Sequence, residues 1–302
     1  MSEIRQRYKY LKHKILKTNR YLLTSRIVSF LENANVETPP VGIERKVLLK
    51  FLRRHVASMF NYPYILKYHY RRVKVSRDKA TGLHYVLTNE NRRLYFKRDM
   101  KIAHIRTLYN NLCSEQDEQS PHNYCFHDFS INSDSVFADV GAAEGMFTLK
   151  FIDKIKTAYL FECDKDWVEA LQSTFQPWSE KVIIVDKYVA DKDSDEFASL
   201  DYFFCEREKP TLIKIDVEGA ESDVLKGAGK LLNEGINDLL VCTYHKRDDE
   251  RNLSEQLRKK GYKSVPSPGY MLMISDNSDS SNDTAEGSFD FRRGLIHAKK
   301  DL

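Results

Sequence analysis

A glycine-containing turn near the middle of the chain has the residues needed to hold a nucleotide-type ligand. Residues 136–140 are mostly apolar and partly β-branched, which favours a strand buried on both faces of a parallel sheet. Gly141 and Gly145 follow, and a residue without a Cβ atom lets the backbone turn sharply and approach a ligand. Residues 146–152 then have the apolar spacing of a helix. Strand, glycine turn and helix in this order predict a pocket at the carboxyl end of the strand.

A second candidate for ligand binding is Glu162, which ends the apolar run 158–161. It lies about 20 residues after the glycine turn, at the end of what we expect to be the next strand. At this spacing an acidic side chain accepts hydrogen bonds from both ribose hydroxyls of a nucleoside. The alternative interpretation is that Glu162 is a solvated residue at a strand end.

Dinucleotide-dependent oxidoreductases are the first class of enzyme to compare with this loop. Their fingerprint requires glycine at the position of Ala143 and a small residue at the position of Met146. The chain has neither, so an NAD(P) site fits the loop poorly.

Three carboxylates surround a glycine after another buried-type strand. The strand covers residues 211–215, and Asp216, Glu218 and Glu221 follow it. Apolar residues between 224 and 232 then predict a helix. The acidic groups could act on a bound substrate, or Glu218 and Glu221 could instead cap that helix, because its N-terminus favours negative charge.

A histidine is expected at the same edge of the sheet. The apolar run 239–243 predicts a neighbouring strand, and Tyr244 and His245 follow it. His245 is the preferred general base, since an unperturbed pKa of about 6.5 suits proton removal at neutral pH. Asp216 and Glu218 could converge with it. These residues lack the spacing of a metal site, so no metal is assigned.

Three strings of the sequence resemble the FkbM-type methyltransferases, a family of S-adenosylmethionine-dependent enzymes with the class I fold. The strings are DVGAAEG, FECD and IKIDVEGAESDVLKGA, and the resemblance runs from about residue 120 to about residue 300. It implies an α/β fold with a Rossmann-like, seven-stranded, mostly parallel sheet. It also implies contacts with S-adenosylmethionine at Asp139, Gly141 and Gly145 for the methionine end, Glu162 for the ribose, Ala190 and Asp191 near the adenine, and Asp216 facing the reacting methyl group. Ala143, in the same loop, is a further expected cofactor contact.

The N-terminal region is strongly basic, whereas the rest of the chain is mildly acidic. Residues 1–75 hold 17 Lys and Arg against 4 Asp and Glu, and residues 76–302 hold 31 against 40. Apolar residues recur near helical spacing over 4–31, which predicts a basic amphipathic helix. Such a helix could contact a membrane surface or an acidic polymer, or it could pack on its own enzyme. Nucleic acid is an unlikely partner because no recognition motif accompanies the charge.

Five cysteines without a CxxC spacing argue against disulfides and zinc sites and favour a reducing cytoplasm. The N-terminus is charged and no run approaches 18 apolar residues, so neither a signal peptide nor a membrane span is expected. The protein is therefore expected in the cytoplasm, with peripheral membrane contact left open.

We expect three regions: a basic helical region (1–75), a β-hairpin with a helix (76–119) and the cofactor-binding domain (120–302). His122 and His127, at the entry to the domain, are further candidates for the cleft. The other expected elements are helices over 43–60, 102–113 and 253–260, hairpin strands over 83–88 and 94–96, terminal strands over 269–274 and 292–298, and a mobile polar segment over 275–288.

The resemblance favours an O-methyltransferase that acts on a sugar hydroxyl in polysaccharide or glycan biosynthesis. The sugar part comes from what the family is commonly associated with. A non-catalytic scaffold that docks on a membrane-associated glycan assembly is the alternative from another functional class. The NAD(P) oxidoreductase is the less favoured enzyme.

Overall fold

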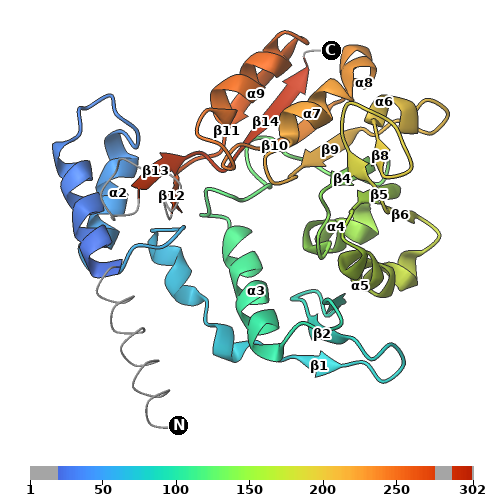
Figure 1. Cartoon of the computed structure of the whole chain (residues 1–302), viewed down its shortest axis with the longest axis horizontal. Helices are drawn as coiled ribbons and strands as arrows, with labels where there is room; N and C mark the ends of the chain where they lie inside the picture. The colour runs from blue at the N-terminus through green and yellow to red at the C-terminus, as the bar shows by residue number, and fades with distance from the viewer. Residues whose placement is uncertain (1–19, 276–287, 301–302) are drawn as a thin grey trace.

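The fold is built on a seven-stranded, mostly parallel sheet, as expected from the sequence (Figure 1). The computed structural model describes residues 20–275 and 288–300. Strands follow the order β11-β14-β10-β9-β4-β5-β6, and only β14 runs antiparallel to its neighbours. The strands are β4 (Val136–Val140), β5 (Thr157–Phe161), β6 (Val182–Val185), β9 (Leu212–Ile215), β10 (Asp238–Cys242), β11 (Tyr262–Pro266) and β14 (Leu295–Lys300).

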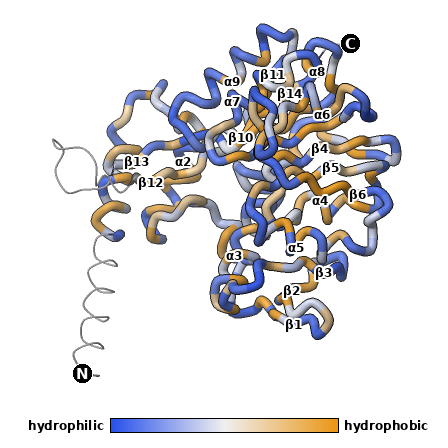
Figure 2. The backbone as a smooth tube through the Cα atoms, turned by 45° about the vertical axis from the view of Figure 1, so that its right-hand side comes forward, coloured by the Kyte–Doolittle hydropathy of each residue, from blue (hydrophilic) through white to orange (hydrophobic). Residues whose placement is uncertain are grey.

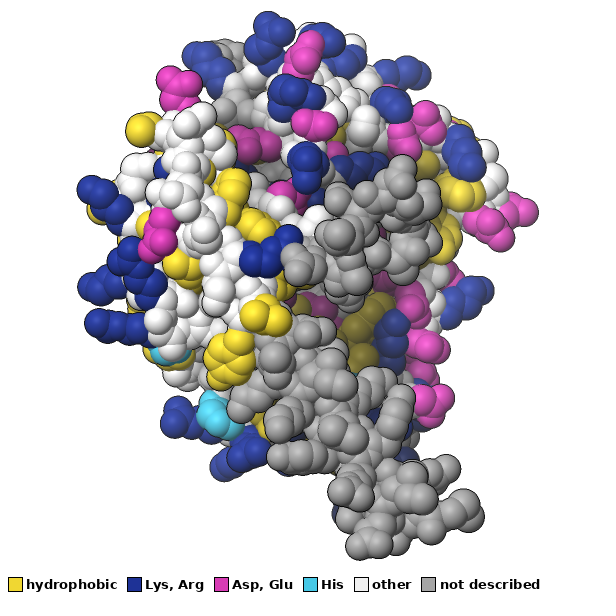
Figure 3. Space-filling model, turned by 60° about the vertical axis from the view of Figure 1, so that its left-hand side comes forward, with side chains coloured by type: hydrophobic (Ala, Val, Ile, Leu, Met, Phe, Trp, Pro, Cys, Tyr) yellow, Lys and Arg dark blue, Asp and Glu magenta, His cyan; other side chains and the backbone are white. Residues whose placement is uncertain are grey.

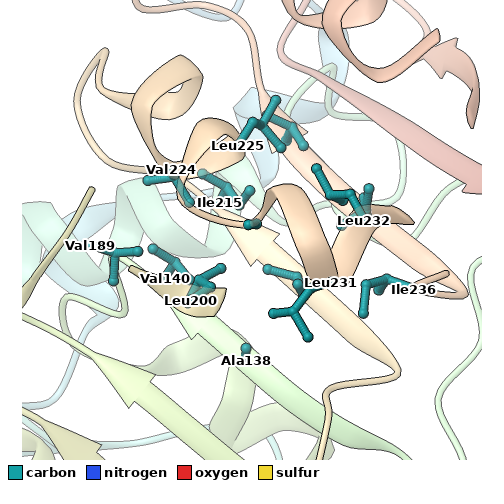
Figure 4. Close-up of a cluster of buried hydrophobic side chains, with 14 of the residues drawn as sticks. Ala138, Val140, Val189, Leu200, Ile215, Val224, Leu225, Leu231, Leu232 and Ile236 are labelled. Atoms are coloured by element: carbon teal, nitrogen blue, oxygen red, sulfur yellow. The ribbon is translucent and has the colours of Figure 1, made fainter. Parts of the chain in front are cut away.

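Consecutive residues of the central strands pack into two cores, one on each face of the sheet. Ala138 and Val140 join a cluster with Ile215, whereas Phe137 joins a second cluster with Leu212. Figure 4 shows part of the first cluster, and the central strands are among the most hydrophobic parts of the tube in Figure 2. Burial on both faces removes a large apolar area from water, which stabilises the sheet.

Helices cover both faces. The first core is closed by α6 (Leu200–Phe203), α7 (Glu221–Lys226), α8 (Gly229–Glu234) and α9 (Asp249–Arg258). The second is closed by α3 (Ile102–Glu115), α4 (Met146–Phe151) and α5 (Lys165–Phe175). Short 3-10 turns follow α4 and α5 at Ile152–Lys154 and Gln176–Trp178, and the short strands β7 (Tyr188–Val189) and β8 (Phe197–Ala198) pair with each other.

The helix expected over 224–232 is split in two. A Cβ atom at Gly227 would lie 2.0 Å from the carbonyl oxygen of Ala190, so the chain is pressed against its neighbour there. The carboxylate of Asp201 then accepts hydrogen bonds from the backbone N–H groups of Lys230 and Leu231 at 2.8–3.0 Å, and so it starts α8. Ala190 and Asp201 both lie in the segment before β9. The apolar spacing within 224–232 gives no information about contacts with that segment, so it could not predict the break.

The terminal strands differ from the prediction. The run 269–274 is not part of the main sheet, because β12 (Met271–Ser275) pairs with β13 (Ser288–Arg292) in a separate two-stranded ribbon. The edge strand β11 was missed because it has little apolar alternation and ends in Pro266. The strand expected over 292–298 is found as β14, three residues further on. Most of the polar segment expected over 275–288 lies outside the described residues.

The N-terminal module, which we define as residues 20–65, packs against the ribbon and away from the main sheet (Figures 1 and 2). Residues 20–33 are helical and bury Ile27 and Leu31, whereas the first part of the predicted amphipathic helix lies outside the described residues. The helix expected over 43–60 is shorter, as α2 covers Gly42–Leu52. The next turn is held against the first helix by a 2.9 Å hydrogen bond from the N–H of Ala57 to Thr24 Oγ1.

The hairpin and the helix between this module and the sheet are confirmed. Strands β2 (His84–Leu87) and β3 (Arg93–Tyr95) pair with each other, and β1 (Ser76–Arg77) adds a short third strand. Two 3-10 turns, Pro63–Lys67 and Tyr70–Arg72, lead into them. Among the described residues, no helix has both the length and the apolar composition to cross a membrane.

Two glycines next to the break between α7 and α8 allow a test of this packing. We expect Gly227→Ala to lower the free energy of unfolding by about 1–3 kcal/mol or more, because the new methyl group meets the Ala190 carbonyl. At Gly229 an added Cβ atom would lie no closer than 3.7 Å to a neighbouring atom, so Gly229→Ala should raise the free energy of unfolding by up to about 1 kcal/mol. Urea denaturation of both variants measures the difference. Equal stability of the two would contradict the close contact at Gly227.

Candidate active site

The glycine turn after β4 is a tight loop with three left-handed residues. Gly141 and Gly145 have φ of 77°, and Ala143 has φ of 47°. A Cβ atom on Gly141 would lie 1.9 Å from the carbonyl oxygen of Asp216. Gly141 is therefore required by the close packing of two neighbouring strand ends, in addition to the ligand approach expected from the sequence.

Glu162 fastens the end of β5 to this loop. Its carboxylate accepts 2.8 Å hydrogen bonds from the N–H of Ala143 and from the N–H of Asp164, and its exposed fraction is 8%. The interpretation of Glu162 as a solvated strand end is therefore wrong. Its proposed contact with a ribose stays a prediction, and each carboxylate oxygen keeps a further acceptor position for it.

A buried ion pair lies directly beneath the loop. Lys214 Nζ donates to Asp139 Oδ1 and to the carbonyl oxygen of Gly141, both at 2.8 Å. Thr148 donates to the other carboxylate oxygen of Asp139 at 2.6 Å. Burial disfavours the charged ammonium, but the carboxylate of Asp139 outweighs it and raises the pKa of Lys214. Asp139 thus supports the loop from below, and its direct contact with a cofactor stays a prediction.

Lys214 was missed in the sequence, although a signal existed. A lysine inside an otherwise apolar strand requires a partner, since an isolated charge is costly to bury. Asp139 is its neighbour in the register of β4 and β9.

Asp216 is held by two tyrosines at the carboxyl end of β9. Tyr124 donates to its Oδ2 at 2.7 Å and Tyr244 donates to its Oδ1 at 3.3 Å. Burial alone would raise the pKa of Asp216, but Lys214 and two histidines lower it below its ordinary value. Asp216 is therefore a carboxylate at neutral pH. No sequence pattern pointed to Tyr124, which lies 92 residues away from its partner Asp216 in the chain.

His245 lies among the three carboxylates that follow β9. Its Nδ1 lies 2.8 Å from Glu221 Oε1, and its Nε2 lies 3.6 Å from Asp216 Oδ1 and 3.5 Å from Glu218 Oε2. Only 8% of its side chain is exposed, and neither ring nitrogen is aligned for a hydrogen bond. Burial opposes the imidazolium, but Glu221, Asp216 and Glu218 outweigh it and raise the pKa of His245.

Glu221 and Glu218 have different roles in this cluster. Glu221 is 1% exposed, and its Oε1 accepts from the N–H groups of Val217 and Gly219 at 3.2 and 3.1 Å. It therefore closes the loop before α7, and the expected helix capping is not what holds it. Glu218 has a 92% exposed side chain and a φ of 53°, a conformation that costs a non-glycine residue about 1 kcal/mol or more.

Two further carboxyl groups, Glu144 and Glu115, face the same region. Burial raises the pKa of Glu144 to about 7. Burial, together with Glu144 and Asp216, also raises the pKa of Glu115 to about 7. The region between the glycine loop, α3 and the end of β9 therefore has a surplus of acidic groups.

Of the other predicted site residues, His122 lies beside the Asp216 tyrosines, whereas His127 lies elsewhere. His122 is buried beside Tyr124 and Tyr244, and burial lowers its pKa to about 4, so it is neutral. His127 contacts His297, which binds Asp238 at the opposite end of β10, so the expectation that it reaches the cleft is wrong. Ala190 and Asp191 lie beside Gly227 at the end of α7.

Two groups of side chains have the composition of metal ligands. Asp216, Glu221 and His245 are close enough together for one ion, as are His122, Asp216 and Cys242. In the first group Glu221 already holds two backbone N–H groups, and in the second Tyr124 hydrogen-bonds Asp216. We therefore interpret both groups as hydrogen-bonded networks.

Several solved structures with a similar fold are methyltransferases by title. A methyltransferase FkbM from Methylobacillus flagellatus aligns with a TM-score of 0.42 and 14% identity over 87% of this chain and 63% of its own length. A precorrin-6y C5,15-methyltransferase from Geobacter metallireducens aligns with a TM-score of 0.38 and 12% identity over 56% and 83%. A putative methyltransferase from Streptococcus mutans, in complex with SAH, aligns with a TM-score of 0.36 and 12% identity over 56% and 90%.

The sequence itself also matches a family. No curated protein matches the chain. Residues 140–264 match the model of the methyltransferase FkbM domain, which covers the sheet from the end of β4 to the middle of β11 and includes Glu162, Asp216 and His245. The chain therefore carries the domain of the FkbM methyltransferases and is a methyltransferase.

Proposed function

We propose that this protein transfers the methyl group of S-adenosylmethionine to a hydroxyl of a sugar in polysaccharide or glycan biosynthesis. The observation that carries the proposal is the position of His245 and Asp216. They follow adjacent parallel strands, β10 and β9, and the end of β9 packs against the glycine loop. Ligands of open α/β sheets bind at this edge.

The residues around the loop fit the proposed cofactor. S-adenosylmethionine supplies an electrophilic methyl group on a sulfonium cation. Asp216 is an ionised carboxylate on one side of the region, Glu144 and Glu115 with pKa values of about 7 add partial negative charge, and Lys214 lies beneath the loop. Opposite charge favours a cationic ligand. Glu162 has carboxylate acceptors for ribose hydroxyls, and Ala190 and Asp191 are the residues proposed for the adenine.

The acceptor proton requires a base, and His245 is the residue we propose. Glu221 Oε1 lies 2.8 Å from Nδ1, and this negative charge favours a proton on that nitrogen, so we propose Nε2, on the side of Asp216 and Glu218, as the acceptor. With the cofactor bound, the acceptor hydroxyl would give its proton to Nε2 as its oxygen takes the methyl group, and the broken methyl–sulfur bond would leave neutral S-adenosylhomocysteine. The new charge on the imidazolium is stabilised by the three carboxylates.

A cavity of about 600 Å³, large enough for a sugar, lies near this centre, and neither Asp216 nor His245 is among its lining residues. It lies between α3, the end of β2 and the start of α4, and its lining includes Tyr109, Gln116 and Phe147. Phe147 contacts Tyr124 at 4.8 Å between ring centroids, so the cavity and Asp216 are separated by one tyrosine. Aromatic rings with polar neighbours are suited to sugars, because they offer apolar faces and hydrogen bonds together.

The observations above favour the methyltransferase over the two alternative functions, the NAD(P) oxidoreductase and the non-catalytic scaffold. An NAD(P) oxidoreductase disagrees with the family match and with Ala143. A non-catalytic scaffold would have no need for a buried histidine with a carboxylate at each nitrogen. Turnover decides between the scaffold and the enzyme.

Cofactor binding is the first test. S-adenosylhomocysteine at 100 times its dissociation constant should stabilise the native state by about 2.7 kcal/mol and raise the melting temperature, whereas NAD should not. Differential scanning fluorimetry with both ligands measures this. A rise with NAD alone would overturn the proposed cofactor.

The base is tested by His245→Asn and by pH. A screen of nucleotide-sugars and lipid-linked oligosaccharides with labelled S-adenosylmethionine first provides an acceptor. Turnover of the wild type should fall as the pH drops below the raised pKa of His245, because the protonated ring cannot accept a proton. The variant should lose this acidic limb and about 10²–10⁴-fold in turnover while keeping its affinity for S-adenosylhomocysteine. An unchanged acidic limb would show that another group is the base.

Contact of the basic N-terminal region with a membrane is part of the proposal and has its own test. Ile27 and Leu31 pack inward, and Figure 3 shows Lys and Arg side chains spread around this face of the molecule. We therefore propose that residues 1–19 carry the contact. Sedimentation with phosphatidylserine vesicles should fall with added salt and on deletion of these residues. Equal sedimentation of the deletion variant would contradict this.

A further inference from the structure

The backbone that carries His245 is held by an arginine from outside the main sheet. Arg292, at the end of β13, donates from Nη1 to the carbonyl oxygen of Tyr244 at 2.8 Å and to that of His245 at 2.7 Å. The arginine is largely buried, with 15% of its side chain exposed. A single guanidinium nitrogen therefore fixes two successive peptide groups next to the proposed base.

This support is needed because sheet pairing has ended before His245. β10 stops at Cys242, and the last bonds to the neighbouring segment are made by Thr243, to the carbonyl oxygens of Gly294 and Arg293 at 2.9 and 3.0 Å. Buried carbonyl groups beyond that point need another partner. Arg292 supplies it.

Arg292 is itself held in place. Its Nε and Nη2 both lie 3.0 Å from Asp290 Oδ2, and Asp290 is 17% exposed. Arg247 also binds this carboxylate at 3.2 Å, but its side chain is 74% exposed, and within the described residues its guanidinium makes no hydrogen bond to a backbone carbonyl. Two arginines thus share one aspartate, and only one of them reaches the His245 segment.

The ribbon that carries Arg292 belongs to the core of the N-terminal module. Phe30 contacts Phe289 and Phe291 at 5.6 and 6.5 Å between ring centroids. The N–H of Leu272 donates to the carbonyl oxygen of Met59 at 2.8 Å. Tyr244 packs against this same cluster and also binds Asp216. The module is therefore connected to the reaction centre by Tyr244, which packs against its cluster, and by Arg292, which its ribbon carries.

We propose that Arg292 is a positioning residue that fixes His245 between Glu221 and the acceptor, and that the N-terminal module acts on the reaction centre through it. The effect on turnover rests on the proposed function. A shift of about 1 Å in a reacting group can cost about 10²-fold in rate. Nothing in the contacts of Arg292 touches the glycine loop, so cofactor affinity should not depend on it.

The experiment compares Arg292→Met with Arg247→Met, which removes the other arginine from Asp290. We expect Arg292→Met to lose about 10–100-fold in kcat, with the KM for the acceptor and the affinity for S-adenosylhomocysteine changed less than about threefold. Arg292→Lys keeps a donor and should recover part of the loss. Arg247→Met should behave as the wild type. Equal losses in the two methionine variants, or loss of cofactor affinity together with kcat, would overturn the proposal.

A second readout does not need the methyl acceptor. The imidazole signal of His245, identified by its absence in His245→Asn, is followed by NMR across pH. If Arg292 holds the ring beside Glu221, the pKa of His245 should fall toward its ordinary value in Arg292→Met. Removing a nearby cation would by itself raise that pKa, so a fall reports the lost contact. An unchanged or raised pKa would overturn the positioning role, even if no acceptor is ever methylated.

Discussion

The ion pair between Lys214 and Asp139 is the interaction on which the rest of the site depends. The side chains are 5% and 1% exposed, and removing two charges from water costs several kcal/mol per ion. The cost is offset only because every strong partner is in place: Asp139 binds the ammonium and Thr148, and Lys214 also binds the Gly141 carbonyl. Breaking such a pair typically costs about 3–5 kcal/mol. The pair therefore ties β4, β9, the glycine loop and α4 together.

The same ammonium sets the charge of the reaction centre. It keeps Asp216 ionised, and Asp216 in turn orders Tyr124 and Tyr244 through hydrogen bonds. One positive charge beneath two carboxylates leaves the region negative. A negative field favours an imidazolium at His245 and a cationic ligand near the loop, as the proposed methyl transfer would need. Fold stability and the proposed chemistry therefore use the same buried charge.

Local sequence patterns predicted the parts of the structure that depend on neighbours in the chain. The parallel strands were found because residues such as Val136–Val140 are apolar on both faces, and the hairpin and α3 were found by alternation and helical spacing. The patterns failed where a distant segment decides the outcome. Gly227 breaks a helix because Ala190 presses on it, and β12 leaves the sheet because the N-terminal module covers it. For the site, strand ends brought Asp216 and His245 together as expected, but Tyr124 and Arg292 are placed by tertiary packing alone.

The glycine loop and the proposed base His245 are supported by different parts of the structure. The glycine loop rests on Lys214 and Glu162, whose contacts lie within the sheet and the two loops at the ends of β4 and β5. His245 rests on Glu221 from within the domain and on Arg292 from the ribbon, which is packed by Phe30 and its neighbours. Changes in the N-terminal module therefore reach the proposed base without passing through the cofactor loop. Under the proposed function, this module can vary without disturbing cofactor binding, because the hydrogen bonds of Lys214 and Glu162 to the loop lie outside it.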